Sequence, residues 1–322
     1  MRAALVALCM ACATPVVAQA PLMSLPVDCT LGESCHIQQF MDRDPGPGAA
    51  DFACGTLSYD GHNGTDFALP SLAARADGVA VLAAADGVVA GVRDGMPDIV
   101  QGAPGAPDVA GRECGNGVVI RHADGYETQY CHLARGSVAV QAGDSVTTGT
   151  ILGLVGLSGQ TEFPHLHLSV RHNGEEIDPF DPAMTAACNG APQDTLWRDA
   201  PAYTGGGIVG LGFATAVPDF AAVKAGTAAE APAPTAPALV LWGHFYGGRT
   251  GDSVQITIDG PQGRILDHRE TLERTQAQLY RAAGRRIPAG GWPAGVYTGK
   301  VQLLRNDAIL ANRQISFEMS PS

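Results

Sequence analysis

The chain has 322 residues, a formal net charge of −12 and 45% hydrophobic residues, and its only lysines are Lys224 and Lys300. Binding to nucleic-acid phosphates or to anionic lipid headgroups depends on clustered basic residues, so this composition argues against both kinds of partner. The length allows two domains, each with an ordinary hydrophobic core.

Residues 1–20 have the features of a secretory signal peptide. Arg2 gives the positive start, Ala3–Cys12 is a short apolar run, and Ala18-Gln19-Ala20 is a small-x-small cleavage site. The apolar run is shorter than the ~20 residues that cross a bilayer, and no later segment is long and apolar enough. We therefore predict an exported protein without a membrane span. We favour the periplasm as its location, with the extracellular space as the alternative.

Six cysteines remain after removal of the signal peptide, and an even number in an exported chain favours disulfides. These six contain no Cys-x-x-Cys pair, which argues against a cysteine zinc site. We predict a Cys114–Cys131 bond, because the hairpin between these cysteines returns the chain near its start. Three pairings stay open for the other four cysteines, which are Cys29, Cys35, Cys54 and Cys188.

Short strand patterns separated by turns fill the first half of the mature chain. Examples are the apolar runs at 81–85 and 88–92 around Asp86-Gly87, and the segments 118–122 and 126–133 around Ala123-Asp124-Gly125. Long helical periodicity is absent from this part of the sequence. We predict an all-β antiparallel domain over residues 56–190, preceded by a cysteine-containing segment over 21–55.

The composition changes after this domain. Residues 225–238 are rich in Ala and Pro and form the linker of a predicted connecting segment over 191–238. Strand patterns return in 239–319, for which we predict a small β-sandwich of immunoglobulin-like form. Residues 270–285 allow a short helix as the alternative. Within the first domain, the Gly- and Pro-rich insertion 94–112 is either a wall of a substrate groove or a disordered loop.

Two polar motifs about a hundred residues apart indicate a metal site. The first contains His62 and Asp66, and the second is Pro164-His165-Leu166-His167-Leu168. Alternate residues of a strand share a face, so the two histidines of the second motif lie together while the leucines enter the core. Spacing alone allows either histidine of that pair to bind metal. Two imidazoles and one carboxylate hold zinc and leave a position open for water.

A third element is Tyr130-Cys131-His132-Leu133, at the end of a predicted strand. Strict alternation places the Tyr130 and His132 side chains on one face and Cys131 on the other. A disulfide role for Cys131 agrees with this arrangement, whereas a metal-ligand role does not. Tyr59 and Tyr130 are candidates for substrate contact, and ordinary packing explains them equally well.

Together these motifs resemble the lysostaphin/LytM-type zinc endopeptidases, also called β-lytic metallopeptidases, a family of murein endopeptidases. Further matches are Gly64–Pro70, Gly115–Ile120, the Gly143-Asp144-x-Val146-x-x-Gly149 pattern and Ile177-Asp178-Pro179. The resemblance covers residues 58–182. It implies that His62, Asp66 and His167 bind one zinc ion, and that His132 and His165 assist catalysis beside the open position. Which of these two histidines is the general base stays open.

The resemblance also implies a function, namely hydrolysis of peptide bonds in bacterial peptidoglycan, in cross-links or stem peptides. The alternative is a non-catalytic relative that activates another cell-wall hydrolase, although here every ligand position is filled. A biotinyl- or lipoyl-carrier domain is excluded because residues 56–190 contain no lysine for attachment. The C-terminal domain carries no recognisable site, and we expect it to contact a divisome or cell-wall partner.

Overall fold

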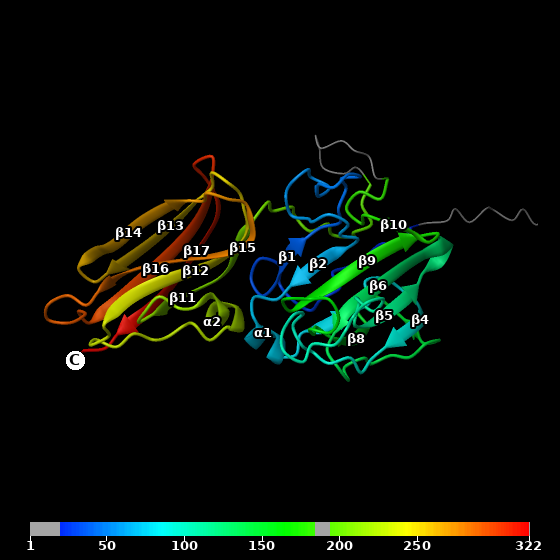
Figure 1. The fold of residues 1–322 in the computed structure, drawn as a ribbon, viewed down its shortest axis with the longest axis horizontal. Helices are drawn as coiled ribbons and strands as arrows, with labels where there is room; N and C mark the ends of the chain where they lie inside the picture. The colour runs from blue at the N-terminus through cyan, green and yellow to red at the C-terminus, as the bar shows by residue number, and fades with distance from the viewer. Residues whose placement is uncertain (1–19, 184–193, 322) are drawn as a thin grey trace, which may run out of the picture.

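The computed structural model describes residues 20–183 and 194–321, so the predicted signal peptide and Cys188 lie outside the described residues. The described chain is nearly all β, as predicted, and every pairing between its named strands is antiparallel. Figure 1 shows two lobes side by side, which we call the first lobe (β1–β10) and the second lobe (β11–β17). None of the helices in the described ranges has the length and apolar character needed to cross a bilayer.

The first lobe is built around one eight-stranded sheet with the order β1-β2-β9-β6-β5-β4-β7, in which β10 pairs with β9. Strands β3 and β8 form a separate two-stranded sheet. The bounds of the elements in this lobe are β1 His36–Gln39, β2 Thr65–Ala68, α1 Leu72–Ala76, β3 Ala80–Leu82, β4 Gly87–Arg93, β5 Asn116–Arg121, η1 Ala123–Gly125, β6 Tyr126–Leu133, β7 Ser145–Val146, β8 Ile151–Leu154, β9 His165–His172 and β10 Glu175–Ile177.

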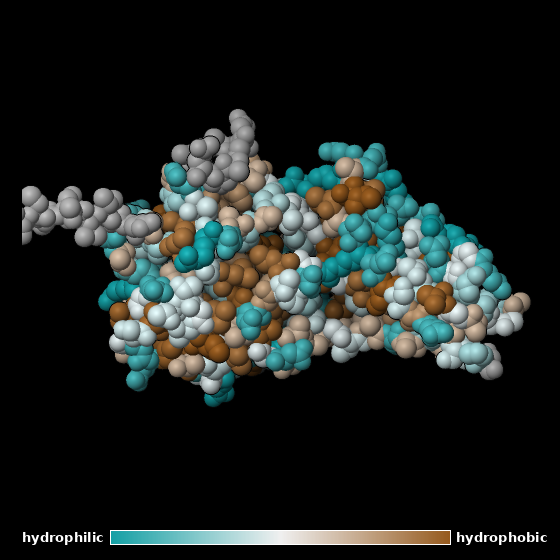
Figure 2. Space-filling view, turned by 180° about the vertical axis from the view of Figure 1, so that it is seen from behind, coloured by the Kyte–Doolittle hydropathy of each residue, from teal (hydrophilic) through white to brown (hydrophobic). Residues whose placement is uncertain are grey.

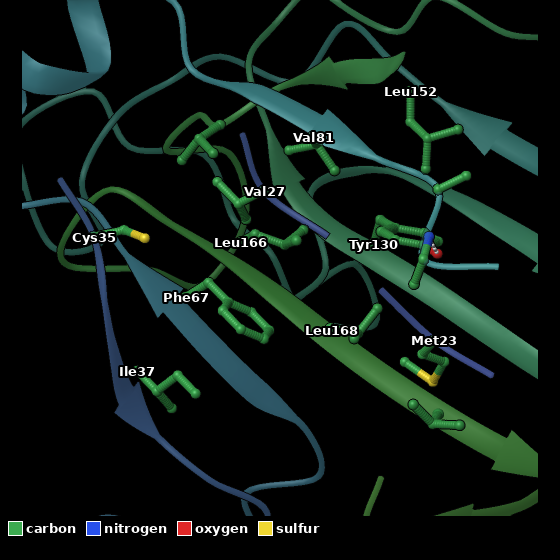
Figure 3. Packing of buried hydrophobic residues seen from close by; sticks show 14 of the residues in the cluster. Met23, Val27, Cys35, Ile37, Phe67, Val81, Tyr130, Leu152, Leu166 and Leu168 are labelled. Carbon is green, nitrogen blue, oxygen red and sulfur yellow. Dashed lines mark hydrogen bonds between the residues drawn. The ribbon is translucent and has the colours of Figure 1, made fainter. Parts of the chain in front are cut away.

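The core of the first lobe lies on one side of this sheet. Leu166 and Leu168 of β9 are fully buried there, and Figure 3 shows them beside Phe67 of β2 and Tyr130 of β6. Met23 of the segment before β1 belongs to the same cluster. Because the core takes every second residue of β9, the intervening histidines lie on the opposite face of the sheet.

The second lobe consists of a three-stranded sheet, β11-β12-β15, and a four-stranded sheet, β14-β13-β16-β17. Side chains of both sheets form one hydrophobic cluster, to which Phe245 of β12 and Val301 of β16 belong. The immunoglobulin-like form stays a prediction. The bounds are β11 Gly207–Ala214, α2 Phe220–Ala225, β12 Ala238–Gly248, β13 Ser253–Gly260, β14 Gly263–Thr271, β15 Gln276–Arg286, β16 Gly295–Arg305 and β17 Ala308–Met319.

The short helix considered for residues 270–285 is wrong. β14 ends at Thr271, and β15 pairs with β12 along nearly its whole length. The long cross-strand ladder satisfies the backbone polar groups of this segment and overrides its local sequence pattern. The expected connecting segment 191–238 also contains β11, which pairs with β12.

Side-chain contacts join the two lobes. The Gln38 side-chain amide in β1 donates to the Ala277 carbonyl oxygen in β15 at 2.9 Å. The His36 ring lies 4.5 Å from the Tyr246 ring, between centroids, and the Arg313 guanidinium donates to the Gly32 carbonyl oxygen. β1 is thus in contact with the second lobe while it pairs with β2, the strand that carries Asp66.

Candidate metal centre

The register of β2 against β9 brings the two distant motifs together. Asp66 lies directly opposite His167, and Ala68 lies opposite His165. His62 lies just before β2, and its Nε2 is 3.2 Å from the Asp66 Oδ1 atom. The Oδ1 atom is also 2.8 Å from His167 Nδ1, and the two ring nitrogens are 3.2 Å apart. Two imidazoles and one carboxylate thus converge on a single point.

Hydrogen bonds at the far side of each ring fix which nitrogen faces that point. His62 Nδ1 is 2.7 Å from the Phe40 carbonyl oxygen, which can only accept, so Nδ1 is the donor of this bond and Nε2 is the nitrogen that faces Asp66. His167 Nε2 is 3.0 Å from the Ser169 hydroxyl oxygen, which leaves Nδ1 toward Asp66. Such outer hydrogen bonds orient metal-binding histidines in proteins.

The donor set suits zinc. One ligand atom each from His62, Asp66 and His167 lies within 4.8 Å of the others, and Asp66 is 3% exposed. Two imidazole nitrogens and one carboxylate oxygen are a donor set of catalytic zinc sites, in which a fourth position is left for water or substrate. A buried carboxylate without a cation nearby is costly, so a bound cation is the natural partner for Asp66.

Gly64 lets the chain approach His167. A Cβ atom at Gly64 would lie 2.6 Å from His167 Nε2 and 2.6 Å from the Leu168 carbonyl oxygen. Both distances are shorter than any normal contact, so a larger residue would displace the ring or the backbone. The glycine between His62 and Asp66 is therefore part of the site's geometry.

The charges of His62 and Asp66 are coupled. Burial opposes protonation of His62, but the nearby Asp66 charge and hydrogen bond more than compensate and raise the pKa of His62 above its ordinary value. Burial likewise opposes ionisation of Asp66, yet His62, His165 and His167 hold the pKa of that carboxyl well below its usual range. Asp66 is therefore an anion at neutral pH, as a metal ligand has to be.

His132 reaches the same face of the sheet by a departure from strand alternation. Cys131 lies directly opposite His167, and Tyr130 lies opposite Leu168 in the core. The expectation that Tyr130 and His132 share a face, with Cys131 on the other, is therefore wrong. Tyr130 is fully buried (Figure 3). Its hydroxyl accepts a hydrogen bond from the Ala84 backbone N–H at 2.8 Å.

A β-bulge is the physical reason for this difference. Asn116 pairs with Leu133 and Val118 pairs with Tyr130, so Gly117 alone faces both Cys131 and His132. His132 has a positive φ of 64°, a conformation that non-glycine residues seldom adopt. A bulge with one such residue redirects a side chain, and here it turns His132 toward the metal-site face. Its ring centroid lies 4.7 Å from that of His165.

The Cys114–Cys131 disulfide is present, as predicted. The Cys114 carbonyl oxygen accepts a hydrogen bond from the His132 backbone N–H at 2.8 Å. Cys114 therefore holds the bulge through two bonds, the disulfide to Cys131 and the hydrogen bond to His132. A Cys29–Cys35 bond is one of the pairings left open by the sequence. Cys54 is disulfide-bonded as well.

His132 and His165 each donate a Nδ1–H proton to a backbone carbonyl. The acceptors are Ser158, at 2.8 Å from His132, and Phe163, at 2.9 Å from His165. The Nε2 atom of each neutral ring is then an unprotonated acceptor. Burial lowers the pKa of both histidines, and for His132 the neighbouring His165 and His167 rings lower it further. Both rings are therefore neutral at pH 7.

A groove of about 350 Å³ opens beside His132 and His167. Tyr59 lies at its edge, is 54% exposed and has its ring 4.5 Å from the His62 ring, whereas Tyr130 is in the core and cannot touch a substrate. None of the described residues that line this groove comes from the 94–112 insertion, so the expected role of the insertion as a groove wall gains no support here and stays a prediction. The lining residues are Tyr59, Gly61, Asn63, Glu113, Cys114, Gln129, Cys131, His132, Gln160, His167, Ser169 and Arg171.

Several residues at the site have no motif in the sequence. Ser158 and Phe40 act through backbone carbonyls, which leave no mark on residue type. Thr161 contributes a side chain, since its Oγ1 lies 3.1 Å from His165 Nδ1. Ser169 and Arg171, by contrast, share the face of His167 by strand alternation, as the sequence predicts.

Comparison with known proteins agrees with this geometry. The model of Peptidase family M23 matches residues 60–179. These residues are therefore similar to an M23 peptidase domain. The resemblance to lysostaphin/LytM-type peptidases is thereby confirmed for this part of the chain.

Two curated relatives of the M23 domain are named as peptidoglycan or DD-peptide hydrolases. The DD-carboxypeptidase/endopeptidase Mpg of Neisseria meningitidis is 37% identical over 123 residues, which cover 38% of this chain and 23% of that protein. The peptidoglycan DD-endopeptidase ShyA of Vibrio cholerae is 35% identical over 117 residues, covering 36% of this chain and 22% of that protein. The chain therefore spans less than a quarter of the length of these relatives.

Solved structures include a zinc-containing peptidase from Vibrio cholerae. It is 28% identical, at a TM-score of 0.34, over 53% of this chain and 41% of that chain.

Proposed function

We propose that this protein is an exported zinc metalloendopeptidase that hydrolyses peptide bonds in bacterial peptidoglycan. The observation that carries the proposal is the convergence of the His62 Nε2 and His167 Nδ1 atoms on the buried Asp66 carboxylate. The M23 domain and its relatives named as DD-endopeptidases support the reaction class and the substrate. The predicted signal peptide supports the location.

His62, Asp66 and His167 would hold the metal in this proposal. Bound zinc supplies a water of lowered pKa, from ~15.7 toward ~7, and polarises the scissile carbonyl. The Nε2 atom of a neutral His132 or His165 accepts the water proton, because Nδ1 of each ring is already committed as a donor. The ring then protonated stabilises the developing oxyanion or returns the proton to the leaving amine.

The half-open groove supports an extended peptide substrate. Its lining residues run from Tyr59 past His167 to Arg171 along the β9 face. Arg171 lies four residues after His167, so a rise of ~3.3 Å per residue gives a run of ~13 Å. That length accommodates about four extended peptide residues on one side of the scissile bond.

The alternative is a non-catalytic relative that activates another cell-wall hydrolase. The cell division protein DipM of Caulobacter vibrioides, 33% identical over 110 residues, shows that M23-like domains occur in proteins named for cell division. The complete set of ligand and assisting histidines argues against that alternative here. For the second lobe we propose a divisome or cell-wall partner.

The experiment measures bound zinc and peptidoglycan cleavage on the purified mature protein. We expect one zinc per chain, released muropeptides, and loss of both in Asp66→Ala. His172→Ala is a matched control, since His172 ends the same strand and lies beside Tyr126, away from the metal site. Less than about half an equivalent of zinc, or unchanged zinc in Asp66→Ala, would contradict the zinc proposal. Full zinc without cleavage, together with stimulation of a second hydrolase, would favour the alternative.

A further inference from the structure

Both assisting histidines depend on one loop, residues 157–163. The His132 ring donates to the Ser158 carbonyl oxygen, and the His165 ring donates to the Phe163 carbonyl oxygen. Thr161 Oγ1 bonds the Phe163 carbonyl oxygen at 2.7 Å and lies within 3.1 Å of His165 Nδ1. A shift of the 157–163 loop would therefore change the orientation of both rings together.

One side of this loop is held by the 94–112 insertion. The Asp98 carboxylate accepts from the Leu157 backbone N–H at 2.7 Å through Oδ1. Its Oδ2 atom accepts from the Arg135 backbone N–H at 2.8 Å, three residues after His132. The Gln101 backbone N–H donates to the Thr161 carbonyl oxygen at 2.8 Å. The insertion therefore bonds both ends of the 157–161 segment and the chain that leaves His132.

The insertion is itself anchored near its start. The Met96 backbone N–H donates to Asn116 Oδ1 at 2.8 Å, and the Asn116 side-chain amide donates to the Met96 carbonyl oxygen at 2.9 Å. Asn116 is fully buried at the beginning of β5. This reciprocal pair keeps residues 96–98 in one place, so the Asp98 carboxylate is presented to the loop by a fixed backbone.

The opposite side of the loop packs backbone against backbone. The Gln160 N–H donates to the Glu113 carbonyl oxygen at 2.7 Å. A Cβ atom at Gly115 would lie 2.3 Å from the Ser158 carbonyl carbon, and one at Gly159 would lie 2.2 Å from the Glu113 carbonyl oxygen. On this side the backbones are so closely packed that no side chain fits between them. On the insertion side the loop is held by the Asp98 side chain, which can be substituted.

We propose that the 94–112 insertion holds the 157–163 loop in place and thereby orients the rings of His132 and His165. Asp98 is the positioning residue that acts through this loop. The inference rests on the proposed peptidase function. Asp98 does not line the groove, so its effect is on ring orientation and not on substrate contact. The proposal predicts that substitution of Asp98 lowers turnover without loss of bound metal or of substrate affinity.

The test compares Asp98→Ala, Asp98→Asn and Asp108→Ala on a soluble cross-linked muropeptide. Asp108 is the matched control, because its carboxylate accepts from the Ala110 N–H within the insertion and is not among the partners of the 157–163 loop. We expect Asp98→Ala to lower kcat about 10- to 100-fold, with KM within about twofold and zinc unchanged. Asp98→Asn keeps one of the two acceptors and should lie between wild type and Asp98→Ala.

Hydrogen exchange of the peptide that spans residues 157–163 gives a readout that does not depend on activity. We expect faster exchange at the Leu157 amide in Asp98→Ala and no change in Asp108→Ala. A wild-type kcat in Asp98→Ala, or equal losses of kcat in the Asp98 and Asp108 variants, would overturn the proposed positioning role of Asp98. A wild-type protein that cleaves nothing would instead contradict the proposed function, while the exchange measurement would still decide whether Asp98 holds the loop.

Discussion

The two halves of the candidate site are constructed differently. The proposed ligands Asp66 and His167 lie on regular antiparallel strands, directly opposite each other. The proposed assisting residue His132 lies on a bulge with positive φ, and its ring and that of His165 are held by loop carbonyls. Regular pairing gives a ligand half that follows from strand alternation. The assisting half requires irregular backbone at His132, because regular alternation after the core residue Tyr130 would place the His132 side chain on the core face.

The two lobes differ in a similar way. Sequence-distant segments of the first lobe meet to form a polar site, while the described residues of the second lobe form two sheets around a continuous apolar cluster. Seen from behind, the lobe at the left of Figure 2 has a broad hydrophobic area, and hydrophilic residues cover much of the lobe at the right. Chemistry in this chain is therefore expected from the first lobe.

The largest expected effect separates the halves by function. His132→Ala should lower kcat about 10²- to 10⁴-fold, the range for loss of a general acid–base group, while zinc stays bound. The physical reason is that His132 is outside the group of convergent ligand atoms. Metal analysis and muropeptide release on the same preparation check this. Loss of zinc together with activity would mean that His132 is a metal ligand, and the division of the site into a ligand half and an assisting half would then be wrong.

Gly64→Ala tests the ligand half alone. The new methyl group would meet His167 Nε2 at 2.6 Å, so the ring has to move and zinc affinity should fall about 10- to 100-fold. Gly91→Ala serves as the control, since a Cβ atom there has open space and the backbone has no positive φ. Zinc titration against a competing chelator measures the effect. Equal affinities in the two variants would show that the close approach at Gly64 is not needed.

Acidification should affect the ligand half first. The pKa of His62 is raised above 6.5, whereas the pKa of His132 is well below 6.5. As the pH falls through the His62 pKa, protons compete with zinc and the apparent affinity drops by up to about tenfold per pH unit, while His132 stays neutral. Activity that is lost as the pH falls toward 6.5, the ordinary value for histidine, should then return with excess zinc. Loss that added zinc does not restore would indicate that an assisting histidine titrates first.

The smallest expected effect concerns the core face of β6. Tyr130→Phe removes the acceptor of the Ala84 N–H and should cost about 1–2 kcal/mol in the free energy of unfolding, with kcat and KM within about twofold of wild type. Denaturant unfolding and muropeptide kinetics measure the two quantities. A large change in KM would mean that Tyr130 contacts substrate, contrary to its position beside Leu168.

Much of the candidate site was predictable, because strand alternation and the order of the motifs can both be read from the sequence. Period-two alternation placed His165 and His167 on the face opposite the buried leucines, and the resemblance in motif order separated the proposed ligand from the assisting residue. The same alternation failed at His132, since a bulge depends on the pairing of β5 with β6 and not on the residues of β6 alone. The Cys114–Cys131 bond was predictable because a hairpin is a local structure.

The sequence by itself determined the all-β class and the likeness to M23 peptidases, and it proposed the residues of the candidate site. Those properties depend on residue type and on spacing within single strands. Only the tertiary structure decided which face His132 occupies, which carbonyl oxygens hold the two assisting rings, and that the 94–112 insertion bonds the 157–163 loop and does not line the groove. These features join backbone atoms that are distant in sequence, and backbone atoms are the same in every residue, so no residue pattern records them.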